Sequence, residues 1–148
     1  MAQTNHATLS GSLKHIHACQ MAGIMPICGV EVYLRDDMTI RENAEVLNAY
    51  WHLVLLAKNI RGWHNLMRAT SRAYLDGFYG RPALDWSVLE ACHEDLICTA
   101  ACVSGPIDDA ILKGDDGRVD FVLDKLLKLF GDDFALTIQP TTSTIRGW

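Results

Sequence analysis

Short apolar runs alternate along this chain with segments in which apolar residues recur at helical spacing. The runs are rich in residues that favour strands, and the run His52–Ala57 is too short for a buried helix. The predicted strands are Met1–Asn5, Ile27–Leu34, His52–Ala57, Leu96–Ala101 and Phe134–Gln139.

Helix signals stand between these strands. Trp63, Leu66 and Met67, followed by Thr70 and Tyr74, place one face of a helix toward a core. Other predicted helices run from a Ser10 cap to Ala22, within Glu42–Tyr50, from an Asp85 cap through Ala91, over Pro106–Leu112, and over Val119–Phe130 before Gly131. Arg35–Asn43 and Gly77–Pro82 are predicted to be loops.

This order of elements predicts an α/β fold built on one mostly parallel sheet. Functional sites in such folds gather where strands end and loops begin. No internal repeat or linker divides the sequence. We therefore expect one domain over residues 1–139, followed by an irregular tail over residues 140–148.

Composition narrows the class of protein. The chain has 148 residues, is 49% hydrophobic and 21% charged, and is long enough for one hydrophobic core. A net charge of −5 indicates no broad basic surface for nucleic acid. No apolar run approaches the roughly 18 residues of a membrane span, and no secretory signal opens the chain. Five cysteines without framework spacing favour a reduced, cytoplasmic compartment.

Four positions could carry chemistry. His6 lies at a strand end, where it could be a metal ligand or simply a turn residue. Glu31 interrupts an apolar strand, where it could be a metal ligand or could face solvent. His52 begins an apolar strand, where it could instead bond to the backbone, and simple topology puts it at the opposite end from His6. Cys102 follows a strand, where its thiol could be a soft metal ligand or could simply be packed in the core.

Two other patterns do not predict a site. His15 and His17 are two residues apart, so on a helix they point in different directions and cannot share an ion. Cys98 and Cys102 lack the spacing of a zinc knuckle, and the chain has no phosphate-binding glycine loop or zinc-protease motif.

Read in order, longer stretches resemble one known family. Thr4-Asn5-His6-Ala7 and the segment from Ala22 to Tyr33 resemble its T-D-H-G and A-G-I-K-P-I-x-G-x-E-x-Y motifs. The segment from His52 to Leu66 resembles H-L-x-x-L-A-x-N-x-x-G-x-x-N-L, and Ala101–Gly105 resembles A-C-L-S-G. Phe130–Phe134 resembles F-G-D-x-F. The family is the PHP (polymerase and histidinol phosphatase) domain of the bacterial or phage-encoded DNA polymerase III alpha subunit.

The resemblance implies a distorted (β/α)7 barrel that binds zinc or manganese ions. In active members of the family such a cluster supports phosphoester hydrolysis, as a 3′–5′ exonuclease or a pyrophosphatase-like activity. Carried over to matching positions, the implied metal ligands are His6, Glu31, His52 and Cys102. The implied partners are DNA and the other polymerase or replisome subunits, reached through the parent protein, and no membrane.

The sequence also departs from the family pattern. Asn5 and Ala7 stand where the family has Asp and Gly, and the family's opening H-x-H strand and closing Asp-x-His motif are not found. The polymerase palm is absent as well, so we expect a PHP domain truncated at both ends, binding one metal ion at most and hydrolysing phosphoesters poorly. The alternatives are an inactive structural module that supports a polymerase, and a free-standing PHP phosphoesterase of the histidinol-phosphatase kind.

Overall fold

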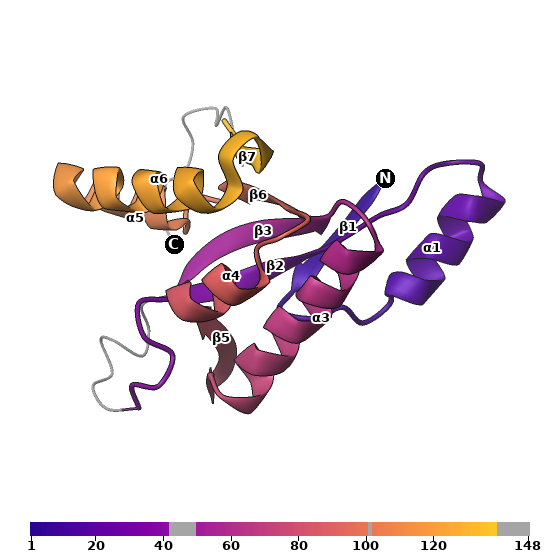
Figure 1. Cartoon of the computed structure of the whole chain (residues 1–148), viewed down its shortest axis with the longest axis horizontal. Coiled ribbons are helices and arrows are strands. Elements are labelled where there is room, and N and C mark those ends of the chain that lie inside the picture. Colours follow the sequence, from indigo (N-terminus) through magenta and orange to yellow (C-terminus); the bar gives the residue numbers. More distant parts are fainter. Residues whose placement is uncertain (42–49, 101, 139–148) are drawn as a thin grey trace, which may run out of the picture.

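A mixed sheet organises the chain in the computed structural model, which describes residues 1–41, 50–100 and 102–138 (Figure 1). Within these residues the sheet has seven strands in the order β4-β5-β2-β3-β6-β7, and β1 also pairs with β2. The strands are β1 (Ala2–His6), β2 (Ile27–Arg35), β3 (Trp51–Ala57), β4 (Phe78–Tyr79), β5 (Arg81–Asp85), β6 (Leu96–Ala100) and β7 (Phe134–Leu136). The helices are α1 (Ser12–Met21), α3 (Ile60–Leu75), α4 (Trp86–Cys92), α5 (Pro106–Leu112) and α6 (Asp116–Phe130), with a 3-10 turn, η1, at Gly131–Asp133.

The direction of β3 makes the sheet mixed. β1 and β5 run parallel to β2, and β7 runs parallel to β6. β3 runs antiparallel to both β2 and β6, and β4 and β5 form an antiparallel pair. The expected α/β class is therefore confirmed. The expectation of a mostly parallel sheet is not, because half of the pairings between described strands are antiparallel.

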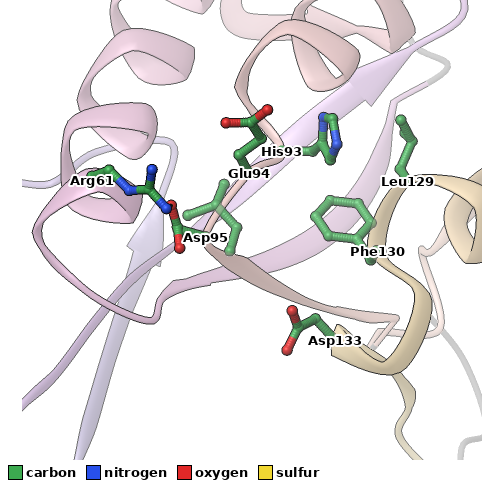
Figure 2. A pocket seen from close by; sticks show the side chains of 8 residues that line it. Arg61, His93, Glu94, Asp95, Leu129, Phe130 and Asp133 are labelled. Carbon is green, nitrogen blue, oxygen red and sulfur yellow. The ribbon is translucent and has the colours of Figure 1, made fainter.

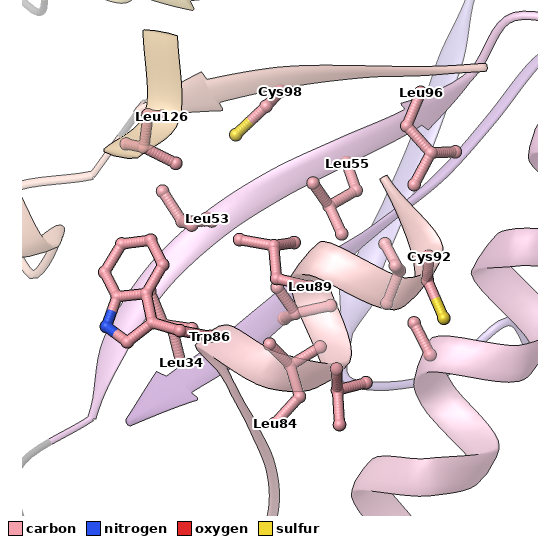
Figure 3. Packing of buried hydrophobic residues seen from close by; sticks show 14 of the residues in the cluster. Leu34, Leu53, Leu55, Leu84, Trp86, Leu89, Cys92, Leu96, Cys98 and Leu126 are labelled. Carbon is pink, nitrogen blue, oxygen red and sulfur yellow. The ribbon is translucent and has the colours of Figure 1, made fainter. Parts of the chain in front are cut away.

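One face of the sheet is the hydrophobic core. Side chains alternate between the two faces of a strand, and Val30, Val32 and Leu34 of β2 are buried together with Leu53 and Leu55 of β3. Figure 3 shows these strands meeting Leu89 of α4 and Leu126 of α6. The intervening side chains of β2 and β3 are only half-buried, so the second face of the sheet is available for a site.

Helix starts are fixed by side chains that the sequence identifies only in part. Asp85 caps α4 by accepting hydrogen bonds from the N–H groups of Ser87 and Val88, as predicted. Asn59 caps α3 in the same way. The predicted Ser10 cap is wrong, because Gly11 is the N-cap of α1 and Ser10 lies in the preceding turn. The Ser10 carbonyl there accepts a hydrogen bond from the Asn5 amide.

The remaining expectations divide into three groups. The predicted strands and the helices over Pro106–Leu112 and Val119–Phe130 are present. The predicted loop over Gly77–Pro82 is wrong, since β4 and the start of β5 pair there as a short hairpin. The predicted helix within Glu42–Tyr50, the tail over residues 140–148, and the strand ends at Ala101 and Gln139 fall largely or wholly outside the described residues. No helix in the described part of the chain is long and apolar enough to cross a membrane.

Replacing a core leucine tests this arrangement. Leu53 is fully buried, so we expect Leu53→Ala to lower the free energy of unfolding by about 2–5 kcal/mol through lost contacts and a residual cavity. Leu13 on α1 is 81% exposed, and the same substitution there serves as the matched control. Urea denaturation followed by circular dichroism measures both. Equal losses for the two variants would contradict the core assignment.

Thiol reactivity tests the burial of β6. Burial raises the pKa of the Cys98 thiol to about 12, so very little reactive thiolate forms at neutral pH. We expect Cys98 to resist maleimide in the folded, chelator-treated protein, while the partly exposed Cys102 is labelled. Mass spectrometry of labelled peptides gives the order, and labelling of Cys98 at the rate of Cys102 before unfolding would contradict the structure.

Candidate metal centre

Three side chains from neighbouring strands meet on the half-buried face of the sheet. His6 ends β1, Glu31 lies in β2, and His52 is near the start of β3. The strand register places His6 opposite Glu31, and places His52 opposite Tyr33, two residues further along β2. Since residues two apart on a strand share a face, the register brings all three candidate side chains to one side of the sheet.

The potential ligand atoms converge closely. Nδ1 of His52 lies 2.7 Å from one Glu31 carboxylate oxygen, and Nε2 of His6 lies 3.6 Å from the other. One ligand atom from each residue lies within 4.8 Å of those of the other two. The side chains of Glu31 and His52 are 16% and 18% exposed, whereas that of His6 is 59% exposed. The group is therefore anchored in the protein on one side and open to solvent at His6.

The His52 ring provides a test of whether a cation fits this group. Its Nδ1 is buried, yet within the described residues nothing meets it in hydrogen-bond geometry, even though Glu31 lies nearby. A buried ring nitrogen without a hydrogen-bond partner is unfavourable in the metal-free protein. A divalent cation would take lone pairs from this nitrogen and from the carboxylate, and two imidazoles with one carboxylate form a known zinc ligand set. The residues fit a metal ion.

The reversed direction of β3 explains the position of His52. In a parallel sheet, a residue at the start of a strand would lie at the opposite end from His6. Because β3 is antiparallel to β2, its start lies beside the end of β2, where Tyr33 pairs with His52. The topological objection raised by the sequence therefore disappears.

Tyr33 closes the matched motif but was not selected as a candidate from the sequence, and the structure places it against two of the potential ligands. Its hydroxyl lies 3.4 Å from Nδ1 of His6, and its ring centroid lies 5.1 Å from that of His52. This contact at Nδ1 leaves Nε2 of His6 facing Glu31, as a supporting partner does for a metal-binding histidine. The signal was available in the sequence, since Tyr33 follows Glu31 by two residues and so shares its face of the strand.

Ala7 lies in the turn that follows His6. Its φ of 53° is in the left-handed region, which disfavours residues with a Cβ. The Ala7 N–H donates to the Glu31 carbonyl at 2.8 Å, which holds the strained turn against β2. A glycine would adopt this turn without strain, which gives a physical reason for the glycine in the family motif.

Cys102 is the one predicted ligand that lies outside the group of three. Its loop is nevertheless close, because the Ser104 carbonyl accepts a hydrogen bond from the His52 N–H at 3.0 Å. Gly105 in turn donates to the Cys102 carbonyl. The role of Cys102 as a ligand therefore stays a prediction.

The other histidine pair lies elsewhere. His15 and His17 are on α1, and the His15 ring contacts the Met1 carbonyl and the Cys19 sulfur. Neither belongs to the group formed by His6, Glu31 and His52.

A polar pocket of about 300 Å³ lies at the other end of the sheet, near the start of β6 (Figure 2). Arg61, Asp95 and Asp133 are among the residues that line it. Asp95 is ion-paired with Arg61 at 2.8 Å, and Asp133 with Lys58 at 2.6 Å. Because these carboxylates are neutralised by side chains of the protein, the pocket is a weaker candidate for a cation than the group around Glu31.

This α/β domain carries on one sheet face two imidazoles and a carboxylate, the donor set of a divalent-metal site. A family model of the PHP domain matches residues 1–141, and the chain belongs to that family. PHP domains are generally metal-dependent, in agreement with the ligand group found here.

Relatives of this chain include DNA polymerase III alpha subunits from several bacteria. The chain is 39% identical over 142 residues to the DNA polymerase III subunit alpha of Borreliella burgdorferi. It is 35% identical over 141 residues to that of Thermus aquaticus, and 33% identical over 141 residues to that of Treponema pallidum. Each alignment covers 94% of this chain but only 12% of the relative. The chain thus corresponds to the PHP region of a replicative polymerase subunit.

The part played by Cys102 can be tested by metal substitution. We expect the cobalt(II)-loaded protein to show a thiolate-to-cobalt charge-transfer band, because a cysteine ligand binds as the thiolate. Cys102→Ser should abolish this band, while Cys28→Ser, which changes another partly buried cysteine, should retain it. Absorption spectra measure the difference. A wild-type spectrum without the band would remove Cys102 from the ligand set and leave the three-residue group.

Proposed function

We propose that this chain serves as the PHP unit of a DNA polymerase III alpha subunit and that its sheet face binds a divalent metal ion for phosphoester hydrolysis. The observation that carries the proposal is the convergence of His6, Glu31 and His52 within 4.8 Å. DNA and other replisome subunits are the proposed partners, because the similar proteins are polymerase subunits. A cytoplasmic setting is part of the same proposal, and the five cysteines are all free thiols.

Zinc or manganese is the proposed ion. Two imidazoles and a carboxylate suit zinc well, and manganese accepts the same donors with a greater preference for oxygen. A divalent ion held there would supply Lewis acidity toward a phosphate oxygen and lower the pKa of a bound water. Glu31 offsets part of the positive charge, and Tyr33 orients His6 through its hydroxyl. The exposed side of His6 leaves room for a phosphate to approach.

The finer fold prediction also belongs to this proposal. We place residues 1–139 in a partial (β/α)7 barrel, whose interior would be the half-buried face that carries Glu31. The support is the two-sided use of β2, with buried Val30, Val32 and Leu34 on one face and Glu31 and Tyr33 on the other. A barrel requires one face of a sheet to be covered by helices and the other to line the interior.

One observation favours the alternative of an inactive supporting module. Asn5 stands where the family motif has an aspartate, and its amide donates to the Ser10 carbonyl at 2.9 Å. The side chain therefore stabilises the turn before α1 and adds no negative charge. Three ligands suffice for one metal ion, whereas a cluster of ions needs more ligands, so we expect weak catalysis or none from this chain alone.

A substitution at Glu31 tests the metal-binding proposal. Glu31→Gln keeps the size of the side chain but removes its charge, so metal affinity should fall by about tenfold or more. Bound zinc and manganese are counted by mass spectrometry and titrated by calorimetry. Glu94→Gln, an exposed carboxylate in the pocket at the other end of the sheet, is the matched control and should bind as the wild type does.

Hydrolysis of a 3′-recessed DNA and of a chromogenic phosphodiester is assayed on the same samples. One bound metal ion with little turnover would agree with the proposal. More than one tightly bound ion, with turnover abolished by Glu31→Ala, would show that the site is more complete than we propose. Unchanged metal affinity in Glu31→Gln would refute the assignment of the site.

A further inference from the structure

The Arg81 guanidinium packs on the Tyr33 ring, which in turn contacts the candidate metal ligands His6 and His52. The Arg81 Cζ atom is 5.5 Å from the centroid of the Tyr33 ring and 5.2 Å from that of Tyr50. The two tyrosine rings are themselves 5.7 Å apart. The hydroxyl of Tyr33 contacts His6, so Arg81, Tyr33 and the metal centre form a continuous series of contacts.

The strand register places Arg81 on the side of the sheet that carries the site. Ala83 pairs with Tyr33 across β5 and β2. Arg81 precedes Ala83 by two residues on β5, so its side chain leaves the same face of the sheet. The group therefore reaches the half-buried face beside Tyr33 and does not point toward the hydrophobic core.

The polar atoms of Arg81 have no partner among the described residues, in contrast to those of several other arginines. Arg61, Arg72 and Arg118 each form an ion pair with an aspartate at the surface. The Arg81 guanidinium instead lies over two tyrosine rings, and a guanidinium that packs its flat face on a ring keeps its N–H donors available at its edge. Two rings thus hold a charged donor group in place without neutralising it.

We propose that Arg81 binds a phosphate group of the ligand that reaches the metal centre, with Tyr33 and Tyr50 holding the guanidinium in position. The inference rests on the proposed function, since it concerns the substrate of that same site. Arginine matches the oxygens of a phosphate with two parallel hydrogen bonds, which lysine cannot do. The phosphate can belong to a free monophosphate or to a nucleic-acid strand, and the two sources are separated by experiment.

The test uses the full 148-residue chain. Wild type, Arg81→Ala and Arg81→Lys are titrated with inorganic phosphate by calorimetry and with a fluorescein-labelled oligothymidylate by anisotropy, each with and without zinc. Arg61→Ala is the matched control, because it removes the same charge in the pocket at the other end of the sheet. Bound zinc is counted for every variant, and circular dichroism confirms that each is folded.

We expect Arg81→Ala to weaken phosphate binding by about tenfold, the loss typical of a charge-assisted hydrogen bond, with the zinc content unchanged. Arg81→Lys should recover part of the affinity, and Arg61→Ala should match the wild type. An effect on both probes identifies the phosphate group alone as the ligand. An effect confined to the oligothymidylate identifies a phosphate within a strand.

Three outcomes would overturn the inference. Equal affinity of wild type and Arg81→Ala for both probes would show that the guanidinium only packs on the tyrosines. Equal weakening in Arg61→Ala would show a general charge effect, and loss of zinc in Arg81→Ala would show a structural role. If no variant binds zinc, the proposed function fails, whereas dependence on Arg81 is still measured in the zinc-free titrations.

Discussion

The pairing of β2 along both of its edges is the constraint on which the rest of the structure depends. β1 and β5 occupy one edge of β2 in succession, and β3 occupies the other. A slip of one residue in this register would move every side chain of the strand to the opposite face. Val30 and Val32 would then leave the core and Glu31 would enter it, so the core and the candidate site are fixed by the same set of backbone hydrogen bonds.

This arrangement separates two opposing energetic demands. A partly desolvated carboxylate such as Glu31 is unfavourable unless a positive group compensates it. Burial of the apolar side chains on the other face of the sheet provides the stability that tolerates it, beneath α3, α4 and α6. The two histidines next to Glu31 come from different strands, so the ligand group that would hold a compensating cation is complete only when both neighbours of β2 are in place.

The sequence predicted those features that local pattern determines. Strong periodicity located the strands and the helix ending at Phe130, and motif order selected His6, Glu31 and His52, which the structure brings together. The direction of β3 was not predictable, because the side-chain pattern of a strand is the same whichever way it runs. The hairpin at β4 and β5 was missed because its strands are short and flanked by glycine and proline, which favour loops.

His6 belongs to a strand that is held less firmly than the residues it faces. Among the described residues β1 pairs with β2 alone, and its side chains are exposed or half-buried. Such a strand separates from the sheet at a small free-energy cost, since little apolar surface is uncovered. An ion that binds only when all three ligands are assembled favours the closed form by mass action. Metal occupancy of the proposed centre would therefore be thermodynamically coupled to the docking of β1, and an ion bound there would slow hydrogen exchange along the whole strand.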